Sequence, residues 1–334
     1  MNKTHYGTLK SGEEIYKFTL KSEDSTAEII SYGATIISFC PFGKEIIAAF
    51  DKVEDYETCR DYRGASVGRV CNRIAGASFE MDGVVYELTK NNGENCLHGG
   101  LDAYSHRPWD VIDYGADFVK LGLVSPDGDG GFPSRVDIEV LFRLSGAALE
   151  VSFKAVPYGK TPIMLTTHGY FNLDSIENTI EDHKFTIYAD EYTEVDETKL
   201  PIGRFPVEGT AFDFRGGKRL AEGLLERPDG FDHNFVLSSN YFISHGSIPL
   251  ALAAVVDGKS LRMNTYTNQP GIQFYAQMKA SEKSPILRGG IKQFGKIAFC
   301  IEPQVEPNCI KSGIGFYNKG EVYESTTLYI VEKI

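Results

Sequence analysis

The sequence has no long apolar run. Its longest one, near Pro249–Val256, is far too short to span a bilayer. The first ten residues, MNKTHYGTLK, hold no apolar stretch of the length found in signal peptides. Six cysteines are scattered without any C-x-x-C pair, namely Cys40, Cys59, Cys71, Cys96, Cys300 and Cys309. Because the chain is large and shows no leader, we expect reduced cysteines and a cytoplasmic protein.

A surplus of positive charge is also absent. Asp and Glu number 46 against 34 Lys and Arg, the net charge is −12, and the cations form no block. Nucleic acids and anionic membranes are bound through clustered cations, so neither is an expected partner. A neutral small molecule is the partner easiest to reconcile with this charge. The oligomeric state stays open.

Cofactor motifs are missing as well. The sequence has no G-x-G-x-x-G or Walker loop, so a nucleotide cofactor is not expected. It has no H-x-x-x-H or H-E-x-x-H pair, so a metal is not expected either. Histidines and carboxylates that are distant in the sequence could still meet in space.

Long helical patterns are nearly absent, and the dominant period is two. Residues 136–144 alternate for much of their length, and Leu149–Ala155 alternates cleanly, which predicts half-buried strands. Asp82-Gly83 and Asp257-Gly258 lie between apolar runs, and Asp-Gly favours the type I′ turn of a hairpin. With no linker or repeat, the pattern predicts a single all-β domain over residues 1–334, a sandwich or barrel.

Five short segments between the apolar runs are dense in polar side chains. They are residues 68–76, 91–100, 166–173, 230–235 and 300–304. Together they offer carboxylates, histidines, arginine and amides, a set that suits acid–base chemistry on a polyhydroxylated ligand. We expect them on loops or strand ends, where binding residues commonly lie.

Glu302 and His168 are the strongest candidates for proton transfer. Glu302 stands in an apolar run where a carboxylate is costly to bury, and Pro303 indicates a strand end or an edge strand. His168 precedes a glycine that permits close backbone approach, and imidazole exchanges protons near neutral pH. The structural alternatives are a salt-bridged rim carboxylate and a core histidine bonded to a carbonyl.

Other candidates are weaker. His98 precedes two glycines, as in a loop histidine presented to a cleft or one that stabilises a turn. Asp232, beside His233, could bind hydroxyl groups or form an Asx turn. Arg73 could donate to a ligand oxygen or pair with a carboxylate. Surface or structural roles are assigned to His5, His106, His183 and His245.

Short motifs follow one another along nearly the whole chain. They are SYGATIIS at 31–38, GRVCNRIAG at 68–76, NCLHGG at 95–100, THGYFNL at 167–173, ADEYTEVDET at 189–198, FDFR at 212–215, GFDHNF at 230–235, QPGIQFY at 269–275 and EPQ at 302–304. Each is weak alone, but in this order and spacing they resemble the aldose 1-epimerase (galactose mutarotase) family. The resemblance implies a large antiparallel β-sandwich of the galactose mutarotase type with few short helices, an open sugar cleft and no cofactor.

The resemblance also implies residue roles. Glu302 would be the general base, His168 the general acid, and His98 would assist near the anomeric carbon. The residues expected to bind the sugar are Arg73, Asp232, Asn72 and Gln273.

Three stretches depart from the family's usual pattern. Thr167 stands where the family usually has Asn, Val305–Cys309 replaces a Pro-Asp-Ala-like run, and the stretch at 40–45 is shorter than typical. No predicted catalytic residue is lost. The departures therefore concern substrate preference rather than reaction class.

The implied reaction interconverts the α and β anomers of a free hexose such as glucose or galactose. Ring opening needs removal of the O1 proton and protonation of the ring oxygen, which a carboxylate and an imidazolium accomplish together. Three other hypotheses stay open. They are a glycoside hydrolase using Glu302 and Asp232, a non-catalytic carbohydrate-binding or sugar-sensing domain, and an epimerase for hexose 6-phosphates, against which the acidic balance argues mildly.

Overall fold

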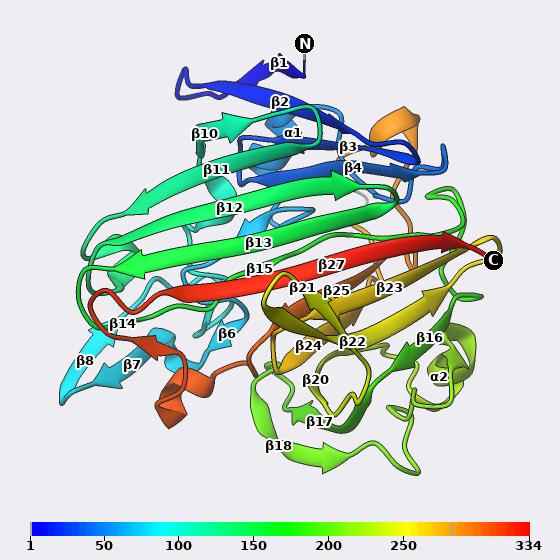
Figure 1. Ribbon diagram of the computed structural model, residues 1–334. Helices are drawn as coiled ribbons and strands as arrows, with labels where there is room; N and C mark the ends of the chain where they lie inside the picture. The colour runs from blue at the N-terminus through cyan, green and yellow to red at the C-terminus, as the bar shows by residue number, and fades with distance from the viewer. Residues whose placement is uncertain (1, 282) are drawn as a thin grey trace.

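Antiparallel strands make up most of the regular structure (Figure 1). The structure is a computed structural model that describes residues 2–281 and 283–334. In these residues the α-helices are two short ones, α1 (Val53–Thr58) and α2 (Leu220–Glu226). Single 3-10 turns lie at Ala75–Ala77, Tyr104–His106, Asp129–Gly131, Arg288–Gly290 and Cys309–Ser312. The prediction of an all-β chain with few short helices is confirmed.

The largest sheet has ten strands, and its long members cross the front of Figure 1. In spatial order the path is β10 (Asp110–Tyr114), β11 (Phe118–Ser125), β12 (Val136–Ser145), β13 (Ala148–Pro157), β27 (Tyr323–Lys333), β23 (Leu261–Thr267), β22 (Ile248–Asp257), β16 (Lys184–Ile187) and β19 (Lys218–Arg219). Strand β21 (Phe242–His245) pairs beside β22.

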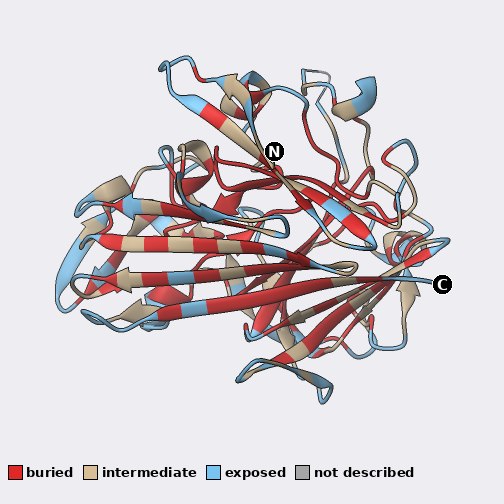
Figure 2. Cartoon of the chain, turned by 45° about the horizontal axis from the view of Figure 1, so that its top comes forward, coloured by how far each residue is buried: buried red, intermediate tan, exposed pale blue. Residues whose placement is uncertain are grey.

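The alternating sequence explains the two central strands. β12 and β13 pair from Val136↔Pro157 to Ser145↔Ala148 and so form a hairpin. The apolar members of the β13 alternation are all buried, namely Leu149, Val151, Phe153 and Ala155. Buried and less buried residues alternate in the same way along the long strands in Figure 2. Both predicted strands are confirmed.

A second sheet of five strands packs against the first. Its order is β18 (Pro201–Pro206), β17 (Ala189–Val195), β20 (Asp232–Leu237), β24 (Gly271–Ala276) and β25 (Phe299–Gln304). The ring of Phe185 on β16 lies 4.8 Å from that of Phe274 on β24. Tyr329 on β27 donates from its hydroxyl to the Ile301 carbonyl of β25 at 3.1 Å. The core therefore lies between two sheets, and the predicted β-sandwich is confirmed.

Smaller sheets complete the described chain. A four-stranded sheet comprises β1 (Lys3–Thr8), β2 (Glu14–Lys21), β3 (Ser25–Ile30) and β4 (Thr35–Pro41). Two-stranded ladders are formed by β14 (Thr161–Pro162) with β26 (Phe316–Tyr317), β15 (Thr166–Thr167) with β5 (Ser66–Val67), β6 (Arg73–Ile74) with β9 (Cys96–Leu97), and β7 (Ser78–Met81) with β8 (Val84–Glu87). The β6–β9 ladder carries site residues, and β15 directly precedes His168.

Both Asp-Gly pairs join adjacent antiparallel strands, so both predicted hairpins are confirmed, but only the first pair forms the expected two-residue turn. Asp82 and Gly83 have φ values of 53° and 79° and join β7 to β8, as a type I′ turn requires. Asp257 instead pairs with Arg262, so the loop between β22 and β23 is longer than two residues. Gly258 is not left-handed. A Cβ there would lie 2.8 Å from Asp174 Oδ1, so this glycine permits a close approach between distant segments.

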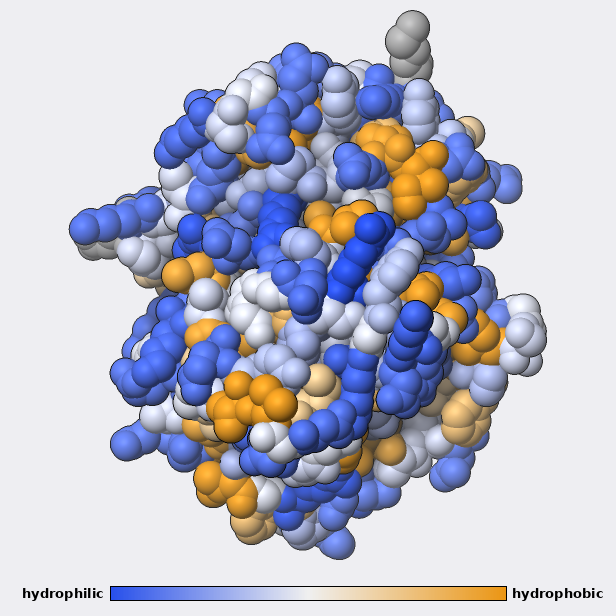
Figure 3. Space-filling model, turned by 90° about the vertical axis from the view of Figure 1, so that its left-hand side faces the viewer, coloured by the Kyte–Doolittle hydropathy of each residue, from blue (hydrophilic) through white to orange (hydrophobic). Residues whose placement is uncertain are grey.

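The surface in Figure 3 is mainly hydrophilic, with small, separate hydrophobic groups. Scattered exposed apolar residues are ordinary for a globular protein. All six cysteines are free. Among the residues described, no helix is both long and apolar enough to cross a membrane. That the whole chain is one domain stays a prediction.

Candidate active site

A pocket of about 220 Å³ opens between the five-stranded sheet, the β6–β9 ladder and the loop segments at residues 60–62 and 168–170. Its lining includes every residue predicted for the site, namely Glu302, His168, His98, Arg73, Asp232, Asn72 and Gln273. Segments far apart in the sequence thus meet in one hollow.

Three neighbouring strands present the acidic and amide side chains. Gln273 on β24 lies directly opposite Glu302 on β25, and β20, which carries Asp232, pairs along the other edge of β24. Strand alternation turns these side chains to one face, while Phe274 and Ile301 are buried on the other. The Gln273 amide donates to Asp232 Oδ1 at 2.7 Å and so fixes both side chains.

Main-chain hydrogen bonds hold the backbone of His168, which directly follows β15. Its N–H donates to the Ala65 carbonyl at 2.9 Å, and its carbonyl accepts from the Gly64 N–H at 2.8 Å. A Cβ at Gly169 would lie 2.8 Å from the Phe171 ring. The glycine after the histidine therefore permits a close approach, as predicted.

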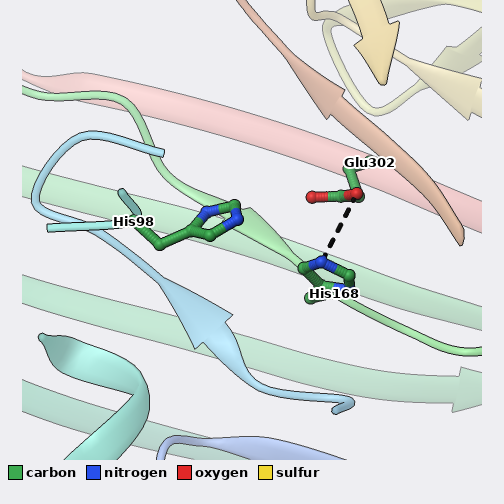
Figure 4. A group of neighbouring side chains, drawn as sticks. All are labelled: His98, His168 and Glu302. Atoms are coloured by element: carbon green, nitrogen blue, oxygen red, sulfur yellow. Dashed lines mark ion pairs between the residues drawn. The ribbon is translucent and has the colours of Figure 1, made fainter. Parts of the chain in front are cut away.

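Glu302 and His168 face each other across the pocket (Figure 4). Glu302 Oε1 lies 3.7 Å from His168 Nε2, which is too long for a hydrogen bond. The residues are 2% and 7% exposed. Among the described residues, Glu302 Oε2 and His168 Nδ1 have no hydrogen-bond partner. Such atoms are costly unless solvent or a ligand satisfies them, so the pair has unused capacity to bind a ligand.

Burial shifts both groups toward their uncharged forms. It raises the pKa of Glu302 well above its usual value, and the Asp232 carboxylate raises it further. Burial lowers the pKa of His168 to about 4, although the carboxylates of Asp61 and Asp232 oppose this shift. A neutral carboxyl with a neutral imidazole holds as many protons as a carboxylate with an imidazolium. A proton that moves between the two groups therefore leaves their total number of protons unchanged.

His98 is fixed as a hydrogen-bond donor. Its φ of 52° and that of 90° at Gly99 are left-handed, and a Cβ at Gly99 would collide with the Gly68 carbonyl. The Asn72 N–H donates to His98 Nδ1 at 3.1 Å, so Nε2 carries the hydrogen of the neutral ring. Burial lowers the pKa of His98 well below its usual value, which keeps the ring neutral.

His98, His168 and Glu302 also meet the distance requirement for a metal site. Their potential ligand atoms lie within 4.8 Å of one another, a cluster that sequence spacing did not reveal. A ligating histidine needs a lone pair on the metal-facing nitrogen and usually donates from the other one. The Asn72 N–H bond at Nδ1 requires the opposite tautomer of His98. The cluster therefore fits proton transfer and hydrogen bonding better than metal binding.

Amide groups orient Arg73. Its side-chain Nε donates to Asn92 Oδ1 at 3.0 Å, and its backbone N–H donates to Asn72 Oδ1 at 2.9 Å. Of the two roles considered for this arginine, a donor to a ligand oxygen fits better than a partner for a carboxylate.

Other lining residues were not predicted from the sequence: Arg60, Asp61, Tyr62, Leu97, Tyr170 and Tyr275. Leu97, Tyr170 and Tyr275 belong to motifs that already contain predicted residues, so motif membership could have identified them. The only signal for the remaining three was the polar run Arg60–Arg63.

The other histidines agree with their predicted surface or structural roles. His183 is fully buried and accepts the Leu173 N–H at 3.0 Å. His106 lies behind the pocket, with its ring 5.5 Å from that of Tyr62. His245 lies on β21, 3.3 Å from Glu150.

The model of the family described as aldose 1-epimerase matches residues 16–329. The chain belongs to the aldose 1-epimerase family. It is similar to the galactose mutarotase of Bos taurus, at 36% identity over 97% of this chain and 96% of that protein. It is also similar to the aldose 1-epimerase of Escherichia coli K12, at 34% identity over 74% of each chain. A crystal structure of galactose 1-epimerase from Lactobacillus acidophilus superposes with a TM-score of 0.86 at 26% identity, covering 99% of this chain and 98% of that one.

As an aldose 1-epimerase the chain is an isomerase that binds a sugar. The three departures from the family pattern do not belong to the described lining of the pocket. Thr167 is buried with its hydroxyl 3.5 Å from that of Tyr329, and Val305 and Cys309 line a different, small hollow. The three departures therefore do not contribute to the surface that would contact the sugar, which is formed by the lining residues.

Proposed function

We propose that the chain interconverts the α and β anomers of a free hexose, with glucose and galactose as the first sugars to test. The observation that carries the proposal is the Glu302–His168 pair, which is 3.7 Å apart and buried, with a polar atom on each member that has no partner in the part of the chain that the structure describes. A sugar bound in the pocket would offer hydroxyl groups to the Glu302 carboxyl and the His168 imidazole, which both line it. Galactose appears in the names of the relatives, and glucose is its C4 epimer.

In the proposed ring-opening step Glu302 accepts the proton of the O1 hydroxyl and His168 donates a proton to the ring oxygen. One shared proton is sufficient, because the pair receives one proton as it releases another. The open chain then rotates about C1–C2 and closes on either face, with the two groups in exchanged protonation states. Positioned proton transfer of this kind typically contributes about 10²–10⁴-fold in rate.

Neighbouring groups hold the open chain in a reactive geometry in this proposal. His98 donates from Nε2 to an oxygen near the anomeric carbon, as its fixed tautomer favours. The remaining hydroxyls are held by Asn72, Arg73, Asp232 and Gln273. Fixing the chain in this way lowers the entropy cost of ring closure.

The charge of the lining supports a neutral sugar over a hexose 6-phosphate. Two guanidinium groups, of Arg60 and Arg73, are outnumbered by the carboxyl groups of Asp61, Asp232 and Glu302. A phosphate dianion would meet more carboxyl groups than cations, so hexose 6-phosphates are disfavoured.

Polarimetry on freshly dissolved α-glucose, α-galactose and α-glucose 6-phosphate tests the proposal, with rates extrapolated to zero buffer. We expect faster relaxation of the free sugars, a smaller effect on the phosphate, and no release of the aglycone from an aryl glycoside. Saturable sugar binding without faster relaxation would instead identify a non-catalytic sugar-binding domain.

A further inference from the structure

A fully buried arginine lies behind the pocket. Arg63 is 2% exposed. Its Nε and Nη2 lie 2.9 and 2.8 Å from Asp61 Oδ2. Its Nη1 donates to the Ala48 carbonyl at 3.1 Å, and Nη2 donates to Gln293 Oε1 at 2.9 Å. The guanidinium is thus held by segments from distant parts of the chain, in one orientation.

The guanidinium lies against a tyrosine that in turn lies against His168. The Arg63 guanidinium carbon is 4.0 Å from the centre of the Tyr170 ring, within cation–π range. The Tyr170 ring is 5.0 Å from the His168 ring at an interplanar angle of 14°. The Tyr170 hydroxyl donates to the Asp61 carbonyl at 3.0 Å. Arg63, Tyr170 and His168 therefore form one series of planar groups, tied at its far end to Asp61.

Local backbone geometry explains how neighbouring residues reach both sides of this series. Tyr62 has a φ of 56° and Gly64 one of 71°, both left-handed. A Cβ at Gly64 would collide with the Ile36 carbonyl, so glycine is required there. As a result Tyr62 lines the pocket while Arg63 is directed into the protein.

Asp61 and Arg63 act on His168 with opposite signs. The Asp61 carboxylate raises the pKa of His168, and the Arg63 guanidinium lowers it. The other titratable groups around the imidazole are Asp232 on β20, Tyr275 on β24, Glu302 on β25, and His98, Tyr62 and Tyr170 from the loops. A cation alone behind Tyr170 would oppose protonation of His168, and the neighbouring carboxylate compensates for it.

We infer that the Arg63–Asp61 ion pair, acting through the Tyr170 ring, orients the His168 imidazole and balances the charge next to it. Arg63 is thus a positioning residue for the proposed acid. The kinetic part of the inference rests on the proposed function, whereas its effect on His168 does not. A purely structural ion pair is the competing explanation, since removing one member of any buried pair is destabilising.

The first test replaces the cation with an apolar side chain of similar length, in Arg63→Met. We expect kcat to fall by about tenfold or more, with KM nearly unchanged; this is less than the roughly 10²–10⁴-fold of a positioned acid–base group, because His168 itself is retained. We also expect the pKa of His168 to rise, because Asp61 then acts unopposed. Long-range ¹H–¹⁵N NMR on histidine-labelled protein without sugar measures this titration, with the His168 signal identified by its loss in His168→Gln.

The second test removes the anion instead of the cation, so it should shift the pKa of His168 in the opposite direction. In Asp61→Asn the guanidinium is no longer compensated, so the pKa of His168 should fall. The double variant Asp61→Asn/Arg63→Met should return the titration toward that of the parent. Arg63→Lys keeps the charge but loses the planar face, and we expect a lower kcat with an almost unchanged titration. It also keeps the inference testable if Arg63→Met does not fold.

The chain supplies a chemically matched control at the surface. Arg135 lies 2.8 Å from Asp137 and 4.9 Å from the centre of the Tyr158 ring, and Tyr158 donates to Asp137 at 2.9 Å. Arg135→Met should leave both kcat and the His168 titration unchanged.

Two results would overturn the inference: parental kcat in a folded Arg63→Met protein, or a lower kcat with the same His168 titration in all the variants that change charge. If the parent itself does not accelerate mutarotation, the proposed function fails, but opposite pKa shifts in Arg63→Met and Asp61→Asn would still support the charge balance at His168.

Discussion

The two faces of the five-stranded sheet differ in chemistry although the same strands supply both. On the core face, Phe274 and Ile301 are fully buried among apolar side chains. On the pocket face their chain neighbours Gln273 and Glu302 are almost as buried, but each has a polar atom without a partner among the described residues. Burial is therefore similar on the two faces, and unsatisfied polar atoms are what mark the pocket face as a ligand site.

This difference has an energetic meaning. A buried donor or acceptor without a partner costs about 1–3 kcal/mol. The core face contributes to stability by removing apolar surface from water, whereas the pocket face is left with polar atoms that only solvent or a ligand can satisfy. Substitutions on the two faces should accordingly separate activity from stability.

Glu302→Gln is expected to have the largest effect. It preserves the shape of the side chain but removes the proton-accepting group, so kcat should fall by about 10²–10⁴-fold while sugar binding is largely kept. Polarimetry measures the rate, and a thermal unfolding scan should show no loss of stability because a buried ionisable group has been removed. Glu306→Gln is the control, since Glu306 bonds Thr193 and Arg204 outside the pocket. Relaxation at the parental rate in Glu302→Gln would contradict the assignment.

A pair of adjacent substitutions tests the two faces directly. Phe274→Ala should lower the free energy of unfolding by about 3–5 kcal/mol, with kcat per folded molecule unchanged. Gln273→Ala should instead raise KM, because Asp232 loses the donor that orients it at 2.7 Å. Urea unfolding and initial-rate kinetics on both proteins make the comparison. Equal loss of stability in the two variants would remove the distinction between the faces.

The pH dependence of stability should follow the buried histidines. Burial lowers the pKa of His183 and His233 in the core, and of His168 in the pocket, to about 4. Unfolded histidines titrate near 6.5, so between pH 6.5 and 4 the unfolded chain binds protons that the folded chain does not. The free energy of unfolding should therefore fall as the pH falls through this window. Glu302 contributes with the opposite sign. Because folding raises the pKa of its carboxyl, the free energy of unfolding falls as the pH rises above the pKa of this group in the unfolded chain.

Urea midpoints measured from pH 7 to pH 4 check this expectation. His183→Gln should flatten the curve by about 1–3 kcal/mol across the window without changing kcat at pH 7. Superimposable pH curves for the parent and the variant would show that His183 does not contribute.

Asn234→Leu should have the smallest effect. Asn234 lies on the pocket face of β20 but does not belong to the described lining, and its Oδ1 has no described partner. Its amide nitrogen donates to Thr193 at 3.2 Å. Loss of this bond and removal of the unpaired oxygen offset each other, so the change in stability should stay below about 1 kcal/mol. A large loss of activity would mean that the functional face extends beyond the pocket.

Much of the fold could be predicted because its determinants are local. The alternation at Leu149–Ala155 and the turn at Asp82-Gly83 depend on neighbouring residues, and both are confirmed. The hairpin at Asp257-Gly258 is confirmed but its turn is not, since Asp257 still pairs with Arg262, and the distant Leu173 and Asp174 approach Gly258. Turn preferences depend on neighbouring residues and give no sign of such a long-range contact.

The site divides in the same way. Glu302, His168 and the other predicted residues were found because they stand in motifs shared with a family, and the structure places all of them in one pocket. Arg63 and Asp61 were missed because their significance depends on Ala48, Gln293 and Tyr170, which are remote in sequence. The opposite pKa shifts of Glu302 and His168 were not predictable either, since they follow from burial.

In the proposed mechanism the Glu302–His168 pair receives one proton for each proton that it releases, which has a consequence for proton exchange with the solvent. If each turnover returns to the pair what it removes from it, the catalytic cycle is closed with respect to bulk solvent. Buffer molecules then take part in no proton transfer of the cycle. The enzymatic rate should therefore not depend on buffer concentration, unlike the rate of the spontaneous reaction of the sugar. The same proton would then stay in the pocket and be reused from one sugar molecule to the next.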